Sequence, residues 1–186
     1  MNKKAQIVPI TIVVAIVFLL LGIGITYYTQ GNSCKDIKQV LYYEELEYEI
    51  ADQSADIYDD YSTAMAYYDT NDFDKVILYC EKSRDLSSSY SQKLRQIKAK
   101  YPENPIEILS VRKEMVETEI EYLFALYQSC EYMESASRAY EVGDYDTGGI
   151  NIDGQNEQIN IHDSKVEDYY NLEAEYQELK MELINE

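Results

Sequence analysis

The chain has 186 residues, of which 16 are Lys or Arg, 35 are Asp or Glu and one is His, so its formal charge at neutral pH is −19. A chain this acidic repels the phosphate backbone, and we expect no nucleic-acid partner. With 46% apolar and 27% charged residues, the composition is that of a folded domain rather than a disordered chain. A single His, seven Gly and no Gly-rich phosphate loop leave most hydrolase, kinase and dinucleotide-binding sites without the residues they need.

The N-terminal part carries a long uncharged stretch, from Ala5 to Cys34, with no Asp, Glu, Lys, Arg or His. Residues 7–25 read IVPITIVVAIVFLLLGIGI, and about 20 apolar residues are what a helix needs to cross a bilayer. We therefore expect a transmembrane helix at residues 6–28 that contacts the lipid bilayer through residues 7–28. A cleaved secretory signal and a buried core helix are the alternatives, and the length of the stretch favours an anchor.

The charges on either side of this stretch predict its orientation. Lys3 and Lys4 precede it, and the next positive residue is Lys35. The positive-inside rule then places residues 1–5 in the cytoplasm and the acidic remainder outside the cell membrane. Tyr27 and Tyr28 are suited to the outer headgroup level, because their rings are apolar and their tips are polar.

The sequence Lys3-Lys4-Ala5-Gln6-Ile7 before an unbroken hydrophobic stretch resembles the class III signal of archaeal type IV pilin-like proteins. The resemblance is confined to the N-terminal segment that ends near Ile25, and it implies processing by a membrane peptidase at Lys4, Ala5 and Gln6. Cleavage would fall after Ala5, so that residues 1–5 are a leader and the hydrophobic helix remains as an anchor or a filament core. Two lysines are also common before a plain membrane anchor, and this alternative stays open.

After a linker at residues 29–35, residues 36–186 are predicted to form an acidic, all-α extracytoplasmic domain. Apolar residues recur there at three- and four-residue steps, which is typical of amphipathic helices. About five helices are predicted, at Asp36–Tyr68, Phe73–Leu86, Ser89–Tyr101, from Ile106 or Val111 to Tyr140, and from Ser164 to the C-terminus. Such a succession predicts an antiparallel helical bundle.

The segment Asp144–Asp163 is predicted to be a long loop or a small hairpin, because it contains three glycines and only short apolar alternations. Ser164 and Glu167 have the spacing of a capping box, which places the start of the last helix there. His162, just before it, is expected to be an exposed or capping residue rather than a base.

A faint internal repeat appears when the chain is shifted so that Asp72-Phe73-Asp74 falls on Asp144-Tyr145-Asp146. The segment around Ala64-Met65-Ala66-Tyr67 and Asp72-Phe73-Asp74-Lys75 resembles one helix-turn-helix unit of tetratricopeptide proteins. A solenoid needs about three such units. A degenerate two-copy bundle is therefore the better interpretation.

Two groups of residues are candidates for chemistry, each with a simpler alternative. Asp144, Asp146 and Asp153 lie near glycines in a way that resembles a calcium loop, against a plain acidic turn. Cys80 and Cys130 would form a disulfide in an oxidising exterior, against two buried free thiols. No nucleophile and base are spaced for catalysis, so we expect neither enzyme activity nor a cofactor.

Charge and tyrosine content suggest how the domain works. Six positive charges between Lys93 and Lys113 are expected to face the acidic tail from Asp163 to Glu186. Eighteen of the 20 tyrosines follow Asp36, and adjacent residues on a helix point about 100° apart. One ring of each adjacent pair should therefore face outward and bind another protein or a second copy: Tyr42 and Tyr43, Tyr67 and Tyr68, Tyr169 and Tyr170. The expected function is protein–protein contact at the cell surface, and the alternative is a pilin-like filament subunit.

Overall fold

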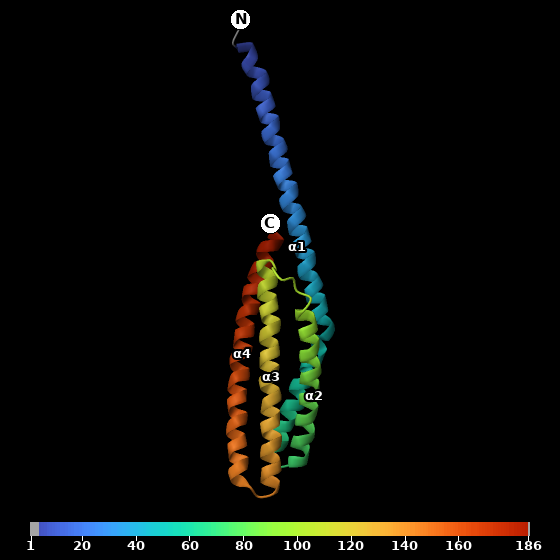
Figure 1. The fold of residues 1–186 in the computed structure, drawn as a ribbon, viewed down its shortest axis with the longest axis vertical. Helices are drawn as coiled ribbons and strands as arrows, with labels where there is room; N and C mark the ends of the chain where they lie inside the picture. The colour runs from blue at the N-terminus through green and yellow to red at the C-terminus, as the bar shows by residue number, and fades with distance from the viewer. Residues whose placement is uncertain (1–3, 186) are drawn as a thin grey trace.

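In the computed structural model the chain folds into four helices, α1 (Lys4–Asp69), α2 (Phe73–Lys98), α3 (Glu107–Glu141) and α4 (Tyr145–Asn185). The structure describes the backbone of residues 4–185 and the side chains of residues 34–185. Successive helices run antiparallel, and α1 projects well beyond the other three (Figure 1). The predicted all-α bundle is confirmed, but it contains four helices in the described residues rather than about five.

The helix α1 is continuous, so residues 29–35, predicted as a linker, are part of it. The predicted amphipathic helix at 36–68 is confirmed. Tyr43, Ile57 and Ala64 are buried at steps of two or four helical turns, which keeps them on one face. Among residues 34–185 no helix is both long and apolar enough to cross a membrane, and the span predicted at 6–28 lies outside that range.

The helix α2 is uninterrupted, and the predicted break at Ser87-Ser88 is wrong. Its buried positions alternate in steps of three and four, as an inward-facing stripe should: Val76, Cys80, Ser83, Ser87, Tyr90, Leu94 and Ile97. Two serines on this stripe are compatible with close helix contact, because their side chains are small. Ser83 Oγ donates to the backbone carbonyl of Ile57 on α1 at 3.1 Å.

The helix α4 begins at Tyr145, so the predicted loop or hairpin at Asp144–Asp163 is wrong, and Ser164 lies inside a helix rather than at its start. Two of the three glycines here serve packing instead of a turn. A Cβ on Gly154 would lie 2.6 Å from the ring of Tyr132, and one on Gly148 would collide with the ring of Tyr140. Without side chains, both positions let α4 approach the tyrosines of α3 closely.

The α1–α2 and α3–α4 turns are related by the shift that defines the predicted repeat. The helix α1 ends at Asp69 and α3 at Glu141, and the shift that places Asp72 on Asp144 also places the one helix end on the other. Each turn contains a left-handed residue, Asn71 (φ 58°) and Gly143 (φ 78°), of the types that tolerate this conformation. The resemblance to a tetratricopeptide unit stays a prediction.

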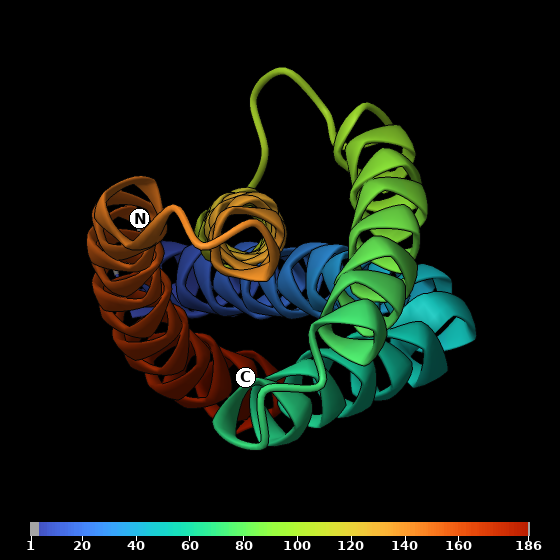
Figure 2. The ribbon, with the colours of Figure 1, turned by 90° about the horizontal axis from the view of Figure 1, so that it is seen from below.

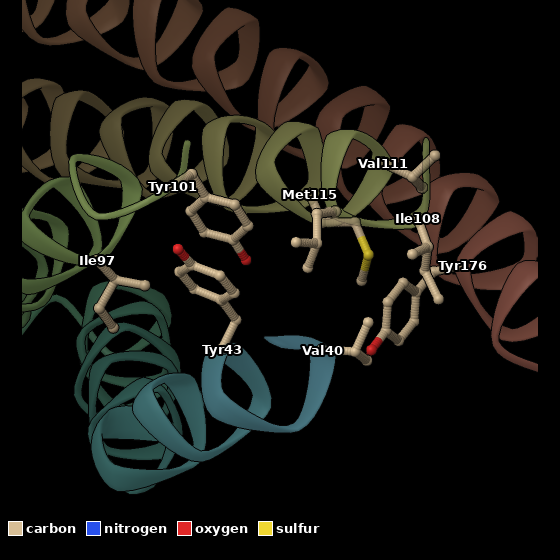
Figure 3. Packing of buried hydrophobic residues seen from close by; sticks show 9 residues of the cluster. Val40, Tyr43, Ile97, Tyr101, Ile108, Val111, Met115 and Tyr176 are labelled. Carbon is tan, nitrogen blue, oxygen red and sulfur yellow. The ribbon is translucent and has the colours of Figure 1, made fainter. Parts of the chain in front are cut away.

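The core consists of three clusters stacked along the bundle, all built from residues after Lys38. In the cluster nearest the α2–α3 loop, the rings of Tyr43 and Tyr101 stack with centroids 4.0 Å apart, and Met115 lies nearby (Figure 3). Seen along its axis, the bundle has α3 between α4 and α2 (Figure 2). This order leaves the first and last helices, α1 and α4, in only loose contact.

Candidate functional site

The first and last helices meet mainly through side chains. Backbones pack closely between α1 and α2, α2 and α3, and α3 and α4, whereas α1 and α4 approach at few points. Polar groups bridge them: Gln155 Nε2 donates to Tyr61 Oη at 3.2 Å, and Tyr58 Oη lies 3.1 Å from His162 Nε2. We call this interface the α1–α4 seam.

A cleft of about 690 Å³ opens at the seam, and all four helices contribute to its walls. This volume falls within the range of about 300–1,000 Å³ that is typical of small-molecule sites. Its charged lining has a formal charge of −4, from one arginine and five glutamates: Arg112, Glu44, Glu45, Glu47, Glu119 and Glu173. Five tyrosine side chains also line it: Tyr48, Tyr90, Tyr122, Tyr169 and Tyr176.

The positive charge of the cleft is shared by two glutamates, chiefly Glu47, since Arg112 Nη1 also lies 3.7 Å from Glu44 Oε1. Arg112 Nε and Nη2 donate to the two carboxylate oxygens of Glu47 at 3.2 and 2.7 Å, and Tyr101 Oη donates to Glu47 at 2.9 Å. The guanidinium carbon of Arg112 also lies 4.7 Å from the ring centre of Tyr176. Burial raises the pKa of Glu47, and Arg112 opposes that effect. Because the Arg112 charge is paired, it offers little to an anionic ligand.

Glu44 ties α4 to α1 at one end of the cleft. Lys180 Nζ and Tyr176 Oη donate to Glu44 Oε1 at 2.6 and 2.9 Å. Burial acts against ionisation, but these hydrogen bonds and the nearby positive charges lower the pKa of Glu44. Glu44 is therefore ionised and positioned near neutral pH.

Glu119 has a different environment. It accepts a hydrogen bond from Tyr90 Oη at 2.9 Å, and no ion pair within residues 34–185 includes it. Burial raises the pKa of Glu119. Burial and then the Glu119 charge raise the pKa of four surrounding tyrosines: Tyr58, Tyr90, Tyr122 and Tyr169. Glu119 is thus a largely buried carboxyl group, ringed by aromatic side chains, with no cation paired to it in the described residues.

His162 lies in the middle of α4 and faces α1, so the expectation of an exposed or capping residue is wrong. Its side chain is 12% exposed, and its Nδ1 lies 2.9 Å from Asp163 Oδ1. The Asp163–His162–Tyr58 line has the geometry of a proton relay. Burial and the Glu119 charge raise the pKa of Tyr58, however, so its hydroxyl is a poor nucleophile. The arrangement supports a packing and hydrogen-bonding role.

The three candidate calcium ligands do not form a loop. Asp144, Asp146 and Asp153 precede or lie on the first turns of α4. Asp144 Oδ1 accepts a hydrogen bond from Thr147 N at 3.1 Å, which caps the helix. Hydrogen bonding by Thr147, through its side chain and then its backbone, lowers the pKa of Asp144. In the part of the chain that the structure describes, no group of three or more His, Cys, Asp or Glu residues is placed to hold a metal ion.

Cys80 and Cys130 are fully buried free thiols, so the disulfide alternative is not the one observed. Cys80 Sγ lies 3.8 Å from Met133 Sδ. Hydrogen bonding to Cys130 and burial raise the pKa of the Cys80 thiol. Both thiols are therefore unreactive core residues, whereas Cys34 is exposed.

The predicted tyrosine arrangement holds in two of three pairs. Tyr42 is 48% exposed and Tyr170 is 64% exposed, while their neighbours pack inward. In the third pair both rings are half-buried, because each packs on another aromatic ring near the α1–α2 turn. The inward-facing partners are Tyr43 and Tyr169, and the half-buried pair is Tyr67 and Tyr68.

The predicted attraction between residues 93–113 and the acidic tail is wrong for the described residues, in which no ion pair joins the two. Arg112 turns instead to α1, and Lys98 Nζ pairs with Glu117 on α3 at 2.9 Å. The net charge of a segment does not determine its ion-pair partners, because charged side chains pair with whichever helix lies beside them.

Glu47, Arg112 and Glu119 were missed as site residues by sequence reasoning. A signal was present, since Glu47 falls four positions after Tyr43 and three before Ile50, on the apolar stripe of α1. Glu119 likewise falls between Met115 and Tyr122 on α3. A charged residue on an apolar stripe must be paired or must serve a site.

The predicted processing residues Lys4, Ala5 and Gln6 lie outside the residues whose side chains are described. Comparison of the chain with protein-family models, curated proteins and solved structures finds no match.

Proposed function

We propose that the protein is a non-catalytic helical module, anchored in the cell membrane by residues 6–28, that acts by binding another protein outside the cell. The observation that carries this proposal is a set of exposed apolar side chains on α1 and α4. They are between 51% and 83% exposed: Leu41, Tyr48, Tyr170, Met181 and Ile184. Large exposed apolar patches mark interaction surfaces more often than chance.

These residues form two stripes, one on α1 and one on α4, the two helices that meet at the cleft. Leu41 and Tyr48 are two helical turns apart on α1, and Met181 and Ile184 follow Tyr170 on α4 by three and four turns, so each set shares a helix face. Tyr48 itself lines the cleft. We call the two stripes together the rim face. Its apolar anchors beside acidic groups fit a partner surface that carries both apolar and basic residues.

The proposal is tested with Tyr48→Ser and Tyr170→Ser, combined in the full chain in non-ionic detergent. We expect unchanged helicity and melting temperature, and at least about tenfold weaker self-association or partner capture. Phe124→Ser is the matched control, because Phe124 is 54% exposed on α3, away from the rim face. Equal loss of binding in the control, or unfolding of the double variant, contradicts the proposal.

Anchoring and orientation need their own test. Protease added to intact cells should digest the chain after Tyr28. Full protection contradicts the extracytoplasmic orientation, and release of soluble protein without detergent contradicts the anchor.

A second candidate, a pilin-like filament subunit, is favoured by the unbroken course of α1 out of the bundle. A single continuous helix is what a filament core needs to carry a head domain. Mass spectrometry of the mature N-terminus and electron microscopy of the cell surface separate the two. Retained Met1 favours the plain anchor, whereas a start at Gln6 together with filaments favours the subunit.

A further inference from the structure

The cleft at the α1–α4 seam has the chemistry of a ligand site. Its volume is about 690 Å³, and its walls contain five tyrosines and an excess of four negative charges. Ordinary helix packing would fill such a space with apolar side chains. The cleft is instead a groove open to solvent at the seam, and its lining of rings and carboxylates requires another explanation.

We propose that this cleft binds a small organic cation, either a protonated primary or secondary alkylamine or a quaternary alkylammonium ion. Tyrosine faces attract such cations through the ring quadrupole. Glu119 supplies the counter-charge, because it is largely buried next to Tyr90 and forms no ion pair in the described residues, where Arg112 pairs with Glu44 and Glu47.

Other ligand classes fit less well. An anion would meet five glutamates, and the single arginine is already bound to Glu47 by two hydrogen bonds. A bare metal ion needs several converging oxygen, nitrogen or sulfur ligands. Within the described residues no such group of three His, Cys, Asp or Glu side chains exists. A neutral apolar ligand would leave Glu119 buried and uncompensated.

The experiment is calorimetric titration of the full chain, in non-ionic detergent, with choline and with spermidine. Dimethylbutanol, the neutral carbon isostere of choline, is the ligand control. We expect one of the two cations to bind at a ratio of one per chain, and the isostere to bind at least about tenfold more weakly than choline if choline is that cation. Absence of saturable binding of both cations at millimolar concentration overturns the proposal.

Variants locate the binding. Glu119→Gln keeps the acceptor oxygen for Tyr90 and should weaken cation binding about tenfold or more, and Glu173→Gln on the α4 wall of the cleft should also weaken it. Glu141→Gln, which removes an exposed charge at the far end of α3, is the matched control and should bind like the wild type. If all three variants weaken binding equally, the cation is held only by the overall negative charge and the proposal fails. Tyr48 belongs to both the rim face and the cleft wall, whereas Tyr170 does not line the cleft. Tyr170→Ser alone should therefore weaken protein contact and leave cation binding unchanged, and Glu119→Gln should do the reverse.

Discussion

Three glycines in the first turns of α4 provide a direct test of the packing between α3 and α4. A helical glycine is about 0.8–1.0 kcal/mol less favourable than alanine, because it loses more backbone freedom on folding. Gly149 has no atom within 4 Å of an added Cβ. Gly149→Ala should therefore stabilise the bundle by up to about 1 kcal/mol, which raises the melting temperature of a domain of this size by about 2–4 °C.

Gly148→Ala adds the same helix propensity and a collision with Tyr140. The new Cβ would lie 2.7 Å from Tyr140 Cδ1, and this ring is also packed near Tyr68 and Phe73. Overpacking of this kind costs about 1–3 kcal/mol. After the gain in helix propensity is subtracted, Gly148→Ala should lower the free energy of unfolding by about 0–2 kcal/mol.

The stability of Gly154→Ala should lie between the stabilities of the other two variants. Its Cβ would lie 2.6 Å from Tyr132 Cε1, but Tyr132 is 37% exposed and its ring has room to rotate away. Thermal unfolding followed by circular dichroism should therefore rank the alanine variants in the order Gly149, Gly154, Gly148, from most to least stable. If Gly149→Ala destabilises the protein, or if all three variants melt together, the helical packing of residues 145–154 against α3 is refuted.

Three further predictions concern buried charges and thiols. Arg112→Met should reduce the free energy of unfolding by about 3–5 kcal/mol at neutral pH, because it leaves Glu47 buried without its cation. Replacing both residues by Met should restore most of that loss in urea titrations, and a double variant as unstable as the single one would contradict the ion-pair argument. Burial raises the pKa of Glu119 in the folded state, so its ionised form costs stability above that pKa and costs nothing below the unfolded value of about 4.3. Glu119→Gln should thus raise the melting temperature at pH 7, and the gain should disappear as the pH falls below about 4; an equal gain at both pH values would show that ionisation of Glu119 is not its cause. A thiol reagent should label Cys34 alone in the native protein and all three cysteines in denaturant; labelling of only one in denaturant would indicate a disulfide.

Much of the bundle was accessible from the sequence because helical periodicity is a local property. The α1 stripe that contains Tyr43, Ile57 and Ala64 and the course of α3 followed from apolar residues at steps of three and four. Serine and glycine were misinterpreted as breaks in α2 and α4. At Ser87 and Gly148 a small residue is a packing choice rather than a turn, and only the position of the neighbouring helix distinguishes the two.

The cleft could not have been predicted in the same way, since it depends on which helices are neighbours. Glu47 and Arg112 are far apart in the chain, and nothing local pairs them. For this reason the prediction that residues 93–113 pair with the acidic tail was wrong, since it used only the net charge of each segment. Charged residues on apolar stripes would have identified the positions, but not their partners.

The buried charges at the seam are not explained by stability. A buried ion pair often contributes no more than apolar residues of the same volume, and an unpaired, largely buried carboxyl group such as Glu119 lowers stability. The other interfaces of the bundle show that this chain can pack helices with Leu, Val and small residues, as around Leu94, Leu123 and Val116. The α2–α3 interface also holds a largely buried ion pair, between Arg84 and Glu134, but its two charges are matched, whereas the five glutamates of the cleft share two cations, Arg112 and Lys180. Unmatched charges of this kind concentrate where a protein binds something, and the α1–α4 seam is where the described structure places them.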